Sequence, residues 1–194
     1  MRPLLHILMS HLCSTVNRWA RPKDISEEAC YFDPYSKQLG VEQGSLPDEV
    51  FLGTLLAMGV YSKYDLIENI FASRPDDFLK HGIYTCRFYV DGEWVEVITD
   101  TFLPCIKDNQ SGVLTPIYGH SALRNEMWIS LVEKAFAKAM GSYEAIASVK
   151  IQKALLHLTG GSVQFRHLRD DTIYMDRLAY CTNTYCMCIH HIPY

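Results

Sequence analysis

Gln43–Val60, which reads QGSLPDEVFLGTLLAMGV, is the stretch that decides the fold. Ser45 and Asp48 form the Ser-x-x-Asp pattern of a helix N-terminus, with Pro47 in the first turn, where its missing N–H does no harm. The apolar residues that follow leave almost no polar face, so the pattern predicts a central helix buried in the core. The free N–H groups at the start of such a helix favour a thiolate or another anion. The sequence places Asp48 and Glu49 there and no cysteine.

The composition is typical of an ordinary globular domain. Of 194 residues, 48% are hydrophobic and 21% are charged, and the net charge is -4. These values predict a single domain. Lys and Arg form no cluster, so the sequence lacks the electrostatic footprint of a nucleic-acid-binding protein. No stretch reaches the roughly 18 apolar residues that a membrane span needs. We therefore expect neither a nucleic-acid partner nor a transmembrane segment.

The cysteines and the N-terminus indicate the cellular compartment. Seven cysteines are an odd number in a chain too long to need disulfides for stability, so reduced, intracellular thiols are expected. Met1–Met9 combines a positive charge with a short apolar run, which fits a secretory signal peptide or an N-terminal helix packed on the domain. The helix is favoured because His6 and His11 interrupt the apolar character and no clear cleavage site follows.

Two segments flanking the central helix have local signals of their own. Residues 17–35 predict an irregular arm, because Pro22 breaks any helix, with Trp19 and Phe32 as apolar anchors. Residues 64–71 predict a short amphipathic helix, because their apolar side chains recur on one side.

A β-hairpin is the clearest local feature. Ile83–Val90 and Glu93–Thr99 are strand-like runs joined by Asp91-Gly92, a pair that favours the type I′ turn. Tyr84, Cys86, Phe88 and Val90 share one face of the first arm, and Val95, Val97 and Thr99 share a face of the second. Cys105 follows on a predicted loop.

Two helices are predicted after the hairpin. Asn125–Met140 has a broad apolar stripe that includes Trp128, with Asn125 as N-cap and Gly141 as C′ residue. Three charged residues lie off the stripe: Glu133, Lys134 and Lys138. Lys153–Gly161 predicts a last helix closed by Thr-Gly-Gly.

These segments together resemble the calpain family of papain-like cysteine proteases, over roughly residues 19–163. Residues 43–51 are similar to the family's nucleophile motif, Gln-Gly-x-Leu-Gly-Asp-Cys-Trp-Leu. The Gly-Glu-Trp-Val of the family's hairpin recurs at residues 92–95. Residues 120–145 match the family's pattern almost position by position. The resemblance implies an α+β fold. It would be the first subdomain of a papain-like calpain protease core, mainly helical around the central buried helix, with a small antiparallel β-hairpin sheet.

The same resemblance implies how the chain is divided. Residues 1–16 form an N-terminal segment, 17–165 an incomplete catalytic domain, and 166–194 an unmatched tail. The family's core continues with a strand-rich half that carries the catalytic histidine and asparagine, and about 30 residues are too few to build it. The tail contains residue types that bind zinc, but their spacing fits no standard finger. A truncated reading frame is the favoured interpretation and a metal site the alternative. The residues concerned are Cys181, Cys186, Cys188, His190 and His191.

The implied catalytic site is degenerate. Gln43 falls on the family's oxyanion-hole glutamine, Asp48 on the aspartate before the nucleophile, and Glu49 on the catalytic cysteine. A carboxylate cannot replace a thiolate as the attacking group in thioester chemistry, so no intact catalytic set is expected. Cys105 is the alternative nucleophile, although a lone loop cysteine without a positioned histidine is usually inert. His120 and His157 lie in segments of the same half and are not expected to act as the base.

The family also binds calcium in this half, through a loop aspartate and a glutamate at the start of the long helix. Glu126 matches the glutamate, whereas Gly40 stands where the aspartate would be, and losing one carboxylate weakens such a site. The resemblance thus implies at most a weak remnant of a calcium site at Glu126. The helix dipole explains a glutamate there equally well. No other cofactor is expected.

Three functions follow from these observations. The leading hypothesis is a catalytically inactive calpain-like domain that serves as a binding, scaffold or regulatory module. The resemblance to degenerate calpain-like proteins implies a cytoplasmic, cytoskeleton-associated location and a protein partner. The alternative is a calcium-dependent cysteine endopeptidase of which this chain is a partial or divergent copy. A packing domain with an exposed apolar face is the third hypothesis.

Overall fold

The computed structural model describes residues 18–33, 40–60, 66–74 and 77–161. Its helices are α1 (Pro22–Ile25), α2 (Glu49–Val60), the 3-10 turn η4 (Glu68–Ile70), α3 (Asp77–His81), α4 (Trp128–Met140), α5 (Tyr143–Ile146) and α6 (Ile151–Thr159). Its strands are β1 (Arg18–Ala20), β2 (Val41–Glu42), β3 (Ile83–Val90), β4 (Glu93–Asp100), β5 (Leu103–Lys107), β6 (Leu114–Pro116) and β7 (His120–Ser121). The fold is therefore a mixture of helices and small sheets.

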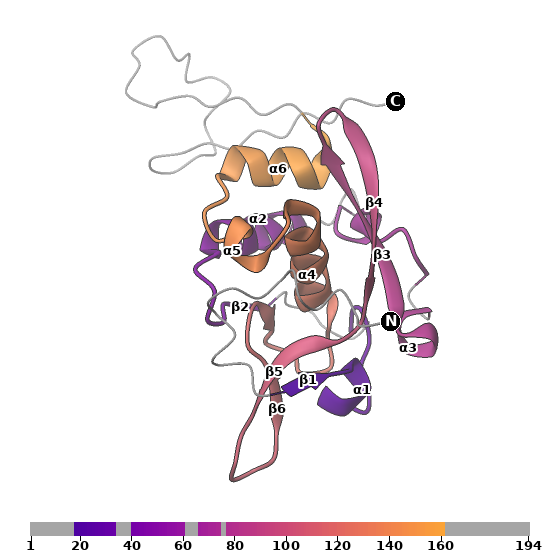
Figure 1. Cartoon of the computed structure of the whole chain (residues 1–194), viewed down its shortest axis with the longest axis vertical. Helices are drawn as coiled ribbons and strands as arrows, with labels where there is room; N and C mark the ends of the chain where they lie inside the picture. Colours follow the sequence, from indigo (N-terminus) through magenta and orange to yellow (C-terminus); the bar gives the residue numbers. More distant parts are fainter. Residues whose placement is uncertain (1–17, 34–39, 61–65, 75–76, 162–194) are drawn as a thin grey trace.

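The strands form small antiparallel sheets around α4. The sheet β1-β5-β6 lies below α4 in Figure 1, the hairpin β3-β4 runs along one side, and β2 pairs with β7. Helix α5 packs on α4, and α6 packs on α2 and β3. The sequence predicted the hairpin but neither of the other two sheets, whose strands are too short to show an alternating pattern.

The hairpin has the predicted turn. Asp91 and Gly92 both have positive φ, 52° and 92°, which is the geometry of a type I′ turn. Tyr84, Cys86 and Phe88 are buried on its inner face, and Thr99 and Val97 lie opposite the first two in the register. Val95, opposite Phe88, is exposed because the hairpin extends beyond the core at its tip.

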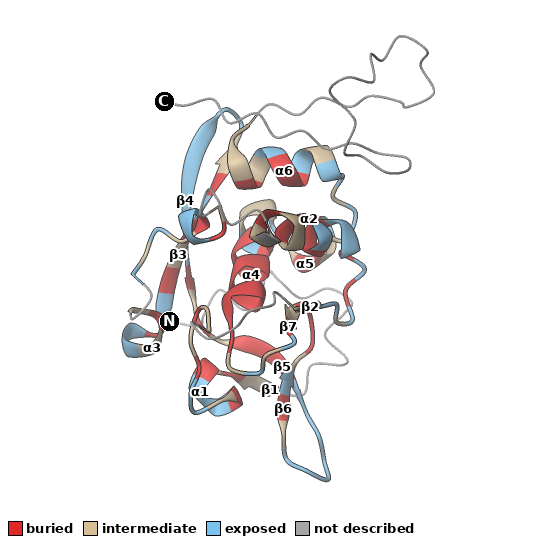
Figure 2. Ribbon diagram, turned by 180° about the vertical axis from the view of Figure 1, so that it is seen from behind, coloured by how far each residue is buried: buried red, intermediate tan, exposed pale blue. Residues whose placement is uncertain are grey.

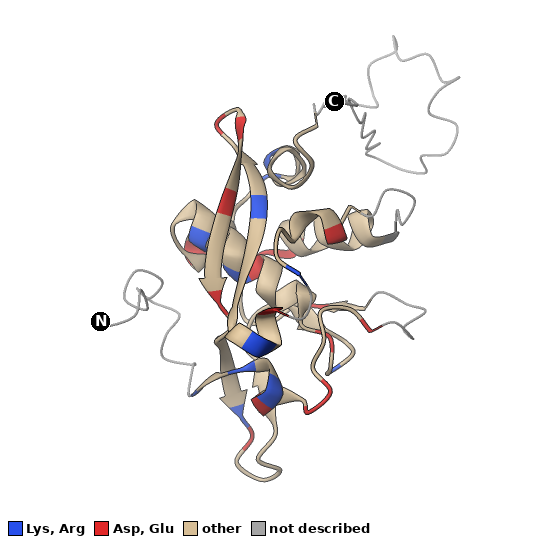
Figure 3. Cartoon of the chain, turned by 90° about the vertical axis from the view of Figure 1, so that its right-hand side faces the viewer, with Lys and Arg blue, Asp and Glu red and all other residues tan. Residues whose placement is uncertain are grey.

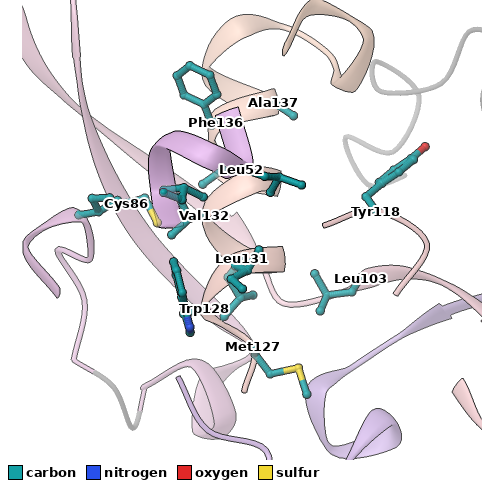
Figure 4. Packing of buried hydrophobic residues seen from close by; sticks show 14 of the residues in the cluster. Leu52, Cys86, Leu103, Tyr118, Met127, Trp128, Leu131, Val132, Phe136 and Ala137 are labelled. Atoms are coloured by element: carbon teal, nitrogen blue, oxygen red, sulfur yellow. The ribbon is translucent and has the colours of Figure 1, made fainter. Parts of the chain in front are cut away.

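Helix α4 is the most deeply buried element. Every residue from Trp128 to Ala137 is buried, and the helix forms the red centre of Figure 2. Figure 4 shows Val132 between Cys86 of the hairpin and Leu52 of α2, and Leu131 on the side of Leu103 of β5. The prediction that α2 would be the central buried helix was thus only partly correct, because Val50 and Gly53 of α2 are exposed.

Two predicted helix N-caps were wrong, by three residues at α2 and by two at α4. Helix α2 begins at Glu49, and the N–H groups of Phe51 and Leu52 donate to Asp48 O, so Asp48 and not Ser45 occupies the N-cap position. The Ser45 N–H instead donates to Ile117 O at 2.8 Å, which holds this segment against the neighbouring loop.

Helix α4 begins at Trp128 with Met127 as N-cap, and not with Asn125. The Asn125 side chain donates to Asp33 Oδ2 at 2.9 Å, and its main-chain oxygen accepts from the Cys30 N–H. Asn125 thus ties the N-terminal arm to the loop before α4. At the other end, Gly141 forms the C-cap with φ 105°, close to the expected position.

The N-terminal arm is more regular than predicted. Pro22 begins the single-turn helix α1, where a proline is tolerated because the first N–H has no helical partner. Trp19 lies in β1, which pairs with β5. Residues 66–71 contain the 3-10 turn η4 and not the predicted amphipathic helix, whose residues 64 and 65 lie outside the described part.

Lys134, predicted to lie off the apolar stripe, is buried at the junction of α4 and β4. Its ammonium group donates to Asp100 Oδ1 at 2.7 Å, Asp100 O at 2.9 Å and Phe102 O at 2.6 Å. The three acceptors match the three donors of a lysine, so the burial is satisfied. The pKa of Lys134 is lowered by burial, although Asp100 opposes this effect.

None of the helices in the described part of the chain has the length and apolar character of a membrane span. Basic and acidic residues are both scattered over the described elements (Figure 3).

Candidate functional site

The nucleophile motif forms a turn in front of α2. Strand β2 pairs with β7, and Gln43 follows it directly. Gly44 packs against the main chain of Ile117 and Tyr118 so closely that any side chain would collide with Ile117 O. The sequence therefore needs glycine at position 44 to bring Gln43 back toward the start of α2.

Gln43 and Glu49 meet at this turn. Gln43 Nε2 donates to Leu46 O at 2.9 Å and to Glu49 Oε2 at 3.2 Å. Glu49 is the first residue of α2 and is exposed, where its negative charge is favoured by the helix dipole. The structure thus brings together the two positions that the motif predicted to be adjacent. An exposed carboxylate in this place can accept hydrogen bonds or bind a cation, but it does not supply a nucleophilic sulfur.

Asp48 points away from this exposed pair. Its side chain is 1% exposed, and no N–H or hydroxyl group of the described residues donates to either of its carboxyl oxygens. Burial is the main cause that raises its pKa, and neighbouring Glu49 raises it further. The consecutive acidic residues at the start of α2 therefore differ in environment, because Asp48 is buried and Glu49 is exposed.

The described cysteines Cys30, Cys86 and Cys105 are free thiols. Cys105 lies in β5 and not on the predicted loop, and its Sγ donates to Leu103 O at 3.5 Å. It is fully buried, and burial raises its pKa to about 12. Burial also raises the pKa of Cys86 and Cys30. A reactive cysteine needs a lowered pKa and access, and none of these three has both.

The two histidines considered as bases contact other partners. His120 Nδ1 lies 2.8 Å from Tyr118 O, and its Nε2 lies 3.2 Å from Glu42 Oε2. His157 Nδ1 lies 2.7 Å from Tyr89 O, at the hairpin. In the described part of the chain, neither histidine is hydrogen-bonded or ion-paired to Gln43 or Glu49, so these residues assemble no pair of nucleophile and base.

The expected calcium remnant is engaged in protein contacts. Glu126 Oε1 accepts from the Asp33 N–H at 2.9 Å, and Oε2 accepts from the Ser121 hydroxyl at 2.7 Å. Gly40 packs against Ala122, and a Cβ there would lie 2.6 Å from Ala122 Cβ. Within the described residues, no group of three metal-ligating His, Cys, Asp or Glu side chains occurs. This donor set does not fit a calcium ion.

A shallow pocket lies beside Glu126, lined among others by Glu42, His120 and Arg124. Of the charged groups that line it, His120 pairs with Glu42, and Glu126 accepts from the Asp33 N–H and the Ser121 hydroxyl. The cysteines and histidines of the C-terminal tail lie outside the described residues.

Sequence reasoning missed Glu133. This side chain is 1% exposed, and its Oε1 accepts from the Gly119 N–H at 3.2 Å. The residue lies in the helix that the sequence predicted most clearly, but a single charged residue beside an apolar stripe is normally solvent-exposed. Only its contacts with other segments reveal its burial.

The chain is similar to known proteins along most of its length. The model of the calpain family cysteine proteases matches residues 7–192. Calpain-type cysteine protease ADL1 of Oryza sativa subsp. japonica is 35% identical over 167 residues, which are 83% of this chain and 7% of that protein. Calpain-B of Drosophila melanogaster is 35% identical over 78% of this chain and 16% of its own length, and Calpain-5 of Mus musculus is 33% identical over 74% and 22%.

These matches first define the class, which is that of cysteine-protease homologues. More narrowly, the chain belongs to the calpain family. It spans less than a quarter of the length of these relatives. The family-model match also extends beyond residues 19–163, on which the resemblance was recognised, and includes most of the tail.

Proposed function

We propose that this chain is a catalytically inactive calpain-like module that binds a protein partner. One observation supports the proposal: the Gln43 amide donates to the Glu49 carboxylate, and the resemblance assigns these two residues to the family's oxyanion-hole glutamine and catalytic cysteine. An amide engaged in this way does not point at a substrate carbonyl, and a carboxylate at position 49 lacks the polarisable sulfur of a thiolate.

The other described thiols support the same proposal. Cys86 and Cys105 are fully buried, and the pKa values of all three described cysteines are raised. A displaced nucleophile in this part of the chain would require a buried thiol, Cys86 or Cys105, to reach solvent, or the partly exposed Cys30 to ionise despite its raised pKa. We therefore propose that this chain binds a protein partner without hydrolysing peptide bonds. As the resemblance implies, we further propose that it is cytoplasmic and that its partner belongs to the cytoskeleton.

Membership of a family of cysteine proteases favours a second candidate, a calcium-dependent cysteine endopeptidase of which this is a partial or divergent copy. The two candidates differ in one measurable property. The endopeptidase requires a thiol that attacks a peptide carbonyl, whereas the binding module requires none.

The test uses the full 194-residue chain with a fluorescently labelled unfolded polypeptide and a thiol-reactive peptidyl epoxide, each with and without calcium. We expect no hydrolysis and no site-specific labelling by the epoxide. Glu49→Cys is the matched variant, and we expect the epoxide to label it at position 49 because the turn that positions this residue is retained. Glu49→Gln, which introduces no thiol, is the control. Hydrolysis by the unaltered chain that stops on alkylation would reject the proposal and support the endopeptidase.

A further inference from the structure

Two buried carboxyl groups meet where the start of α2 packs on α4. Asp48 directly precedes α2, Glu133 lies in α4, and each is 1% exposed. Gly119 marks how closely the elements approach, because a Cβ there would lie 2.7 Å from Leu52 in the first turns of α2 and 3.4 Å from the carboxyl carbon of Glu133. Figure 4 shows Leu52 beside Val132, the residue before Glu133. The Glu133 carboxyl group therefore reaches the beginning of α2.

Each carboxyl group shifts the pKa of the other in the sense of a hydrogen bond that Glu133 donates, which raises the pKa of Glu133 and lowers that of Asp48. An ionised carboxyl group has only acceptor atoms, so such a bond requires a proton on one of the two. Neither oxygen of Asp48 accepts from an N–H or hydroxyl group in the described part of the chain. Glu133 Oε1 is already bound by the Gly119 N–H. This arrangement makes Glu133 the natural donor and Asp48 the acceptor.

The electrostatic surroundings favour retention of this proton. Burial raises the pKa of Glu133 well above its ordinary value, and the charge of Asp48 raises it further. Burial also raises the pKa of Asp48, with Glu49 acting in the same direction. The hydroxyls of Tyr118 and Tyr143 and the carboxyl group of Asp100 are further ionisable groups in this region. Among the described residues, no Lys, Arg or His contributes to the pKa of Asp48 or Glu133. A proton thus takes the place of a countercharge.

We propose that Asp48 and Glu133 share one proton and form a pH-dependent clamp that holds the first turn of α2 against α4. Loss of the proton leaves two negative charges in a buried site, which pushes the start of α2 away from α4. The clamp holds the same turn that carries Glu49 and Gln43, so its opening changes the exposed site. The inference does not depend on the proposed lack of catalysis, because it concerns packing between two helices.

The direction of the pH effect follows from linkage. A carboxyl pair whose pKa is raised in the folded protein binds more protons there than in the unfolded chain. Its contribution to stability is complete below the ordinary carboxyl pKa and is lost as the pH rises through the raised value. For one shared proton, the folding equilibrium constant falls up to about tenfold for each pH unit within this window.

Glu133→Gln is the decisive variant. The glutamine amide donates to Asp48 and its oxygen accepts from Gly119, so the variant imitates the protonated pair permanently. Urea unfolding of the full chain, followed by circular dichroism from about pH 4 to about pH 9, measures the effect. We expect the unaltered chain to lose stability relative to Glu133→Gln as the pH rises. Glu96→Gln, which neutralises an exposed acid on β4, is the control and should follow the unaltered chain. Parallel pH profiles of the unaltered chain and Glu133→Gln would overturn the proposal.

Two further measurements test the proposal on the unaltered chain itself. The N–H groups of Phe51 and Leu52, which donate to Asp48 O, should show protection factors that decrease with pH in the unaltered chain. Infrared spectroscopy of the unaltered chain at neutral pH should show the C=O band of a buried protonated carboxyl group, and Asp48→Asn should alter it. Absence of this band at neutral pH would also overturn the proposal.

Discussion

The side-chain amide of Gln43 donates to the carboxylate of Glu49 at 3.2 Å, across the turn that leads into α2. The same nitrogen donates to Leu46 O at 2.9 Å, so the loop and the first helical residue are held together by one side chain. The side chain at position 49 is consequently exposed and held in a defined place. This position is therefore suitable for testing whether the turn stabilises a negative charge.

We expect Glu49→Cys to acquire a thiol pKa below the ordinary value of about 8.5. The reason is that the helix N-terminus and the Gln43 amide both favour a negative charge at this position. The change should alter the free energy of unfolding by no more than about 0.5 kcal/mol, because the side chain is exposed. The pH dependence of iodoacetamide labelling at position 49 measures the pKa.

Gln43→Ala in the Glu49→Cys background serves as the control for this effect. It should return the thiol pKa part of the way toward its ordinary value, since one hydrogen-bond donor is lost. An unshifted pKa in Glu49→Cys would contradict the prediction and show that the turn does not stabilise an anion.

Lys134→Met should strongly destabilise the protein. The change removes one buried ammonium group and leaves Asp100 Oδ1, Asp100 O and Phe102 O without their shared donor. Breaking a buried charge pair in this way typically costs about 3–5 kcal/mol, and the partial exposure of Asp100 places the expected loss at the lower end of this range. Urea unfolding at neutral pH measures the loss.

Lys138→Met provides a matched comparison on the same helix. Lys138 donates to Ile98 O from an exposed position, one turn after Lys134. Its replacement should cost less than about 1 kcal/mol. Similar losses for the two variants would show that the buried network adds no stability of its own.

The features that sequence reasoning predicted correctly depend on local chemistry. The Asp91-Gly92 turn requires positive φ at two adjacent residues, which few sequences other than this pair tolerate, and the turn then sets the hairpin register. The end of α6 is similarly local, because Gly160 adopts the left-handed conformation at the C-cap.

The features that it missed depend on partners distant in the chain. Cys105 lies in a strand because Arg18, 87 residues earlier, pairs with it. Glu133 and Lys134 are buried because groups on other segments bind them, and the hydrophobic pattern of α4 contains no sign of those groups. The same holds for the helix starts, where Ser45 and Asn125 are engaged by Ile117 and Asp33. Close approach of Gln43 and Glu49 was predictable only from the resemblance.

The exposure and pKa of the described cysteines predict an order of modification. In the native protein at about pH 8, Cys30 should react with iodoacetamide before Cys86 and Cys105, since it alone is partly exposed. The two buried thiols should react only as fast as the protein unfolds. Mass spectrometry of peptides after timed quenching identifies each site, and urea-unfolded protein provides the control. Rapid labelling of Cys105 in the native state would contradict its burial and revive it as a candidate nucleophile.

Glu126 tests whether this chain has kept a calcium site. Both oxygens of the carboxylate accept hydrogen bonds, from the Asp33 N–H and the Ser121 hydroxyl, and a glutamine can accept with only one atom. Glu126→Gln should therefore lower the free energy of unfolding by about 1–3 kcal/mol. Millimolar calcium should not change the melting temperature of either protein, because the ion would have to displace these bonds without help from a carboxylate at position 40. Ser121→Ala, which removes one of the two donors and no charge, should show part of the same loss. A calcium-dependent rise in melting temperature that Glu126→Gln abolishes would show instead that the carboxylate binds the ion.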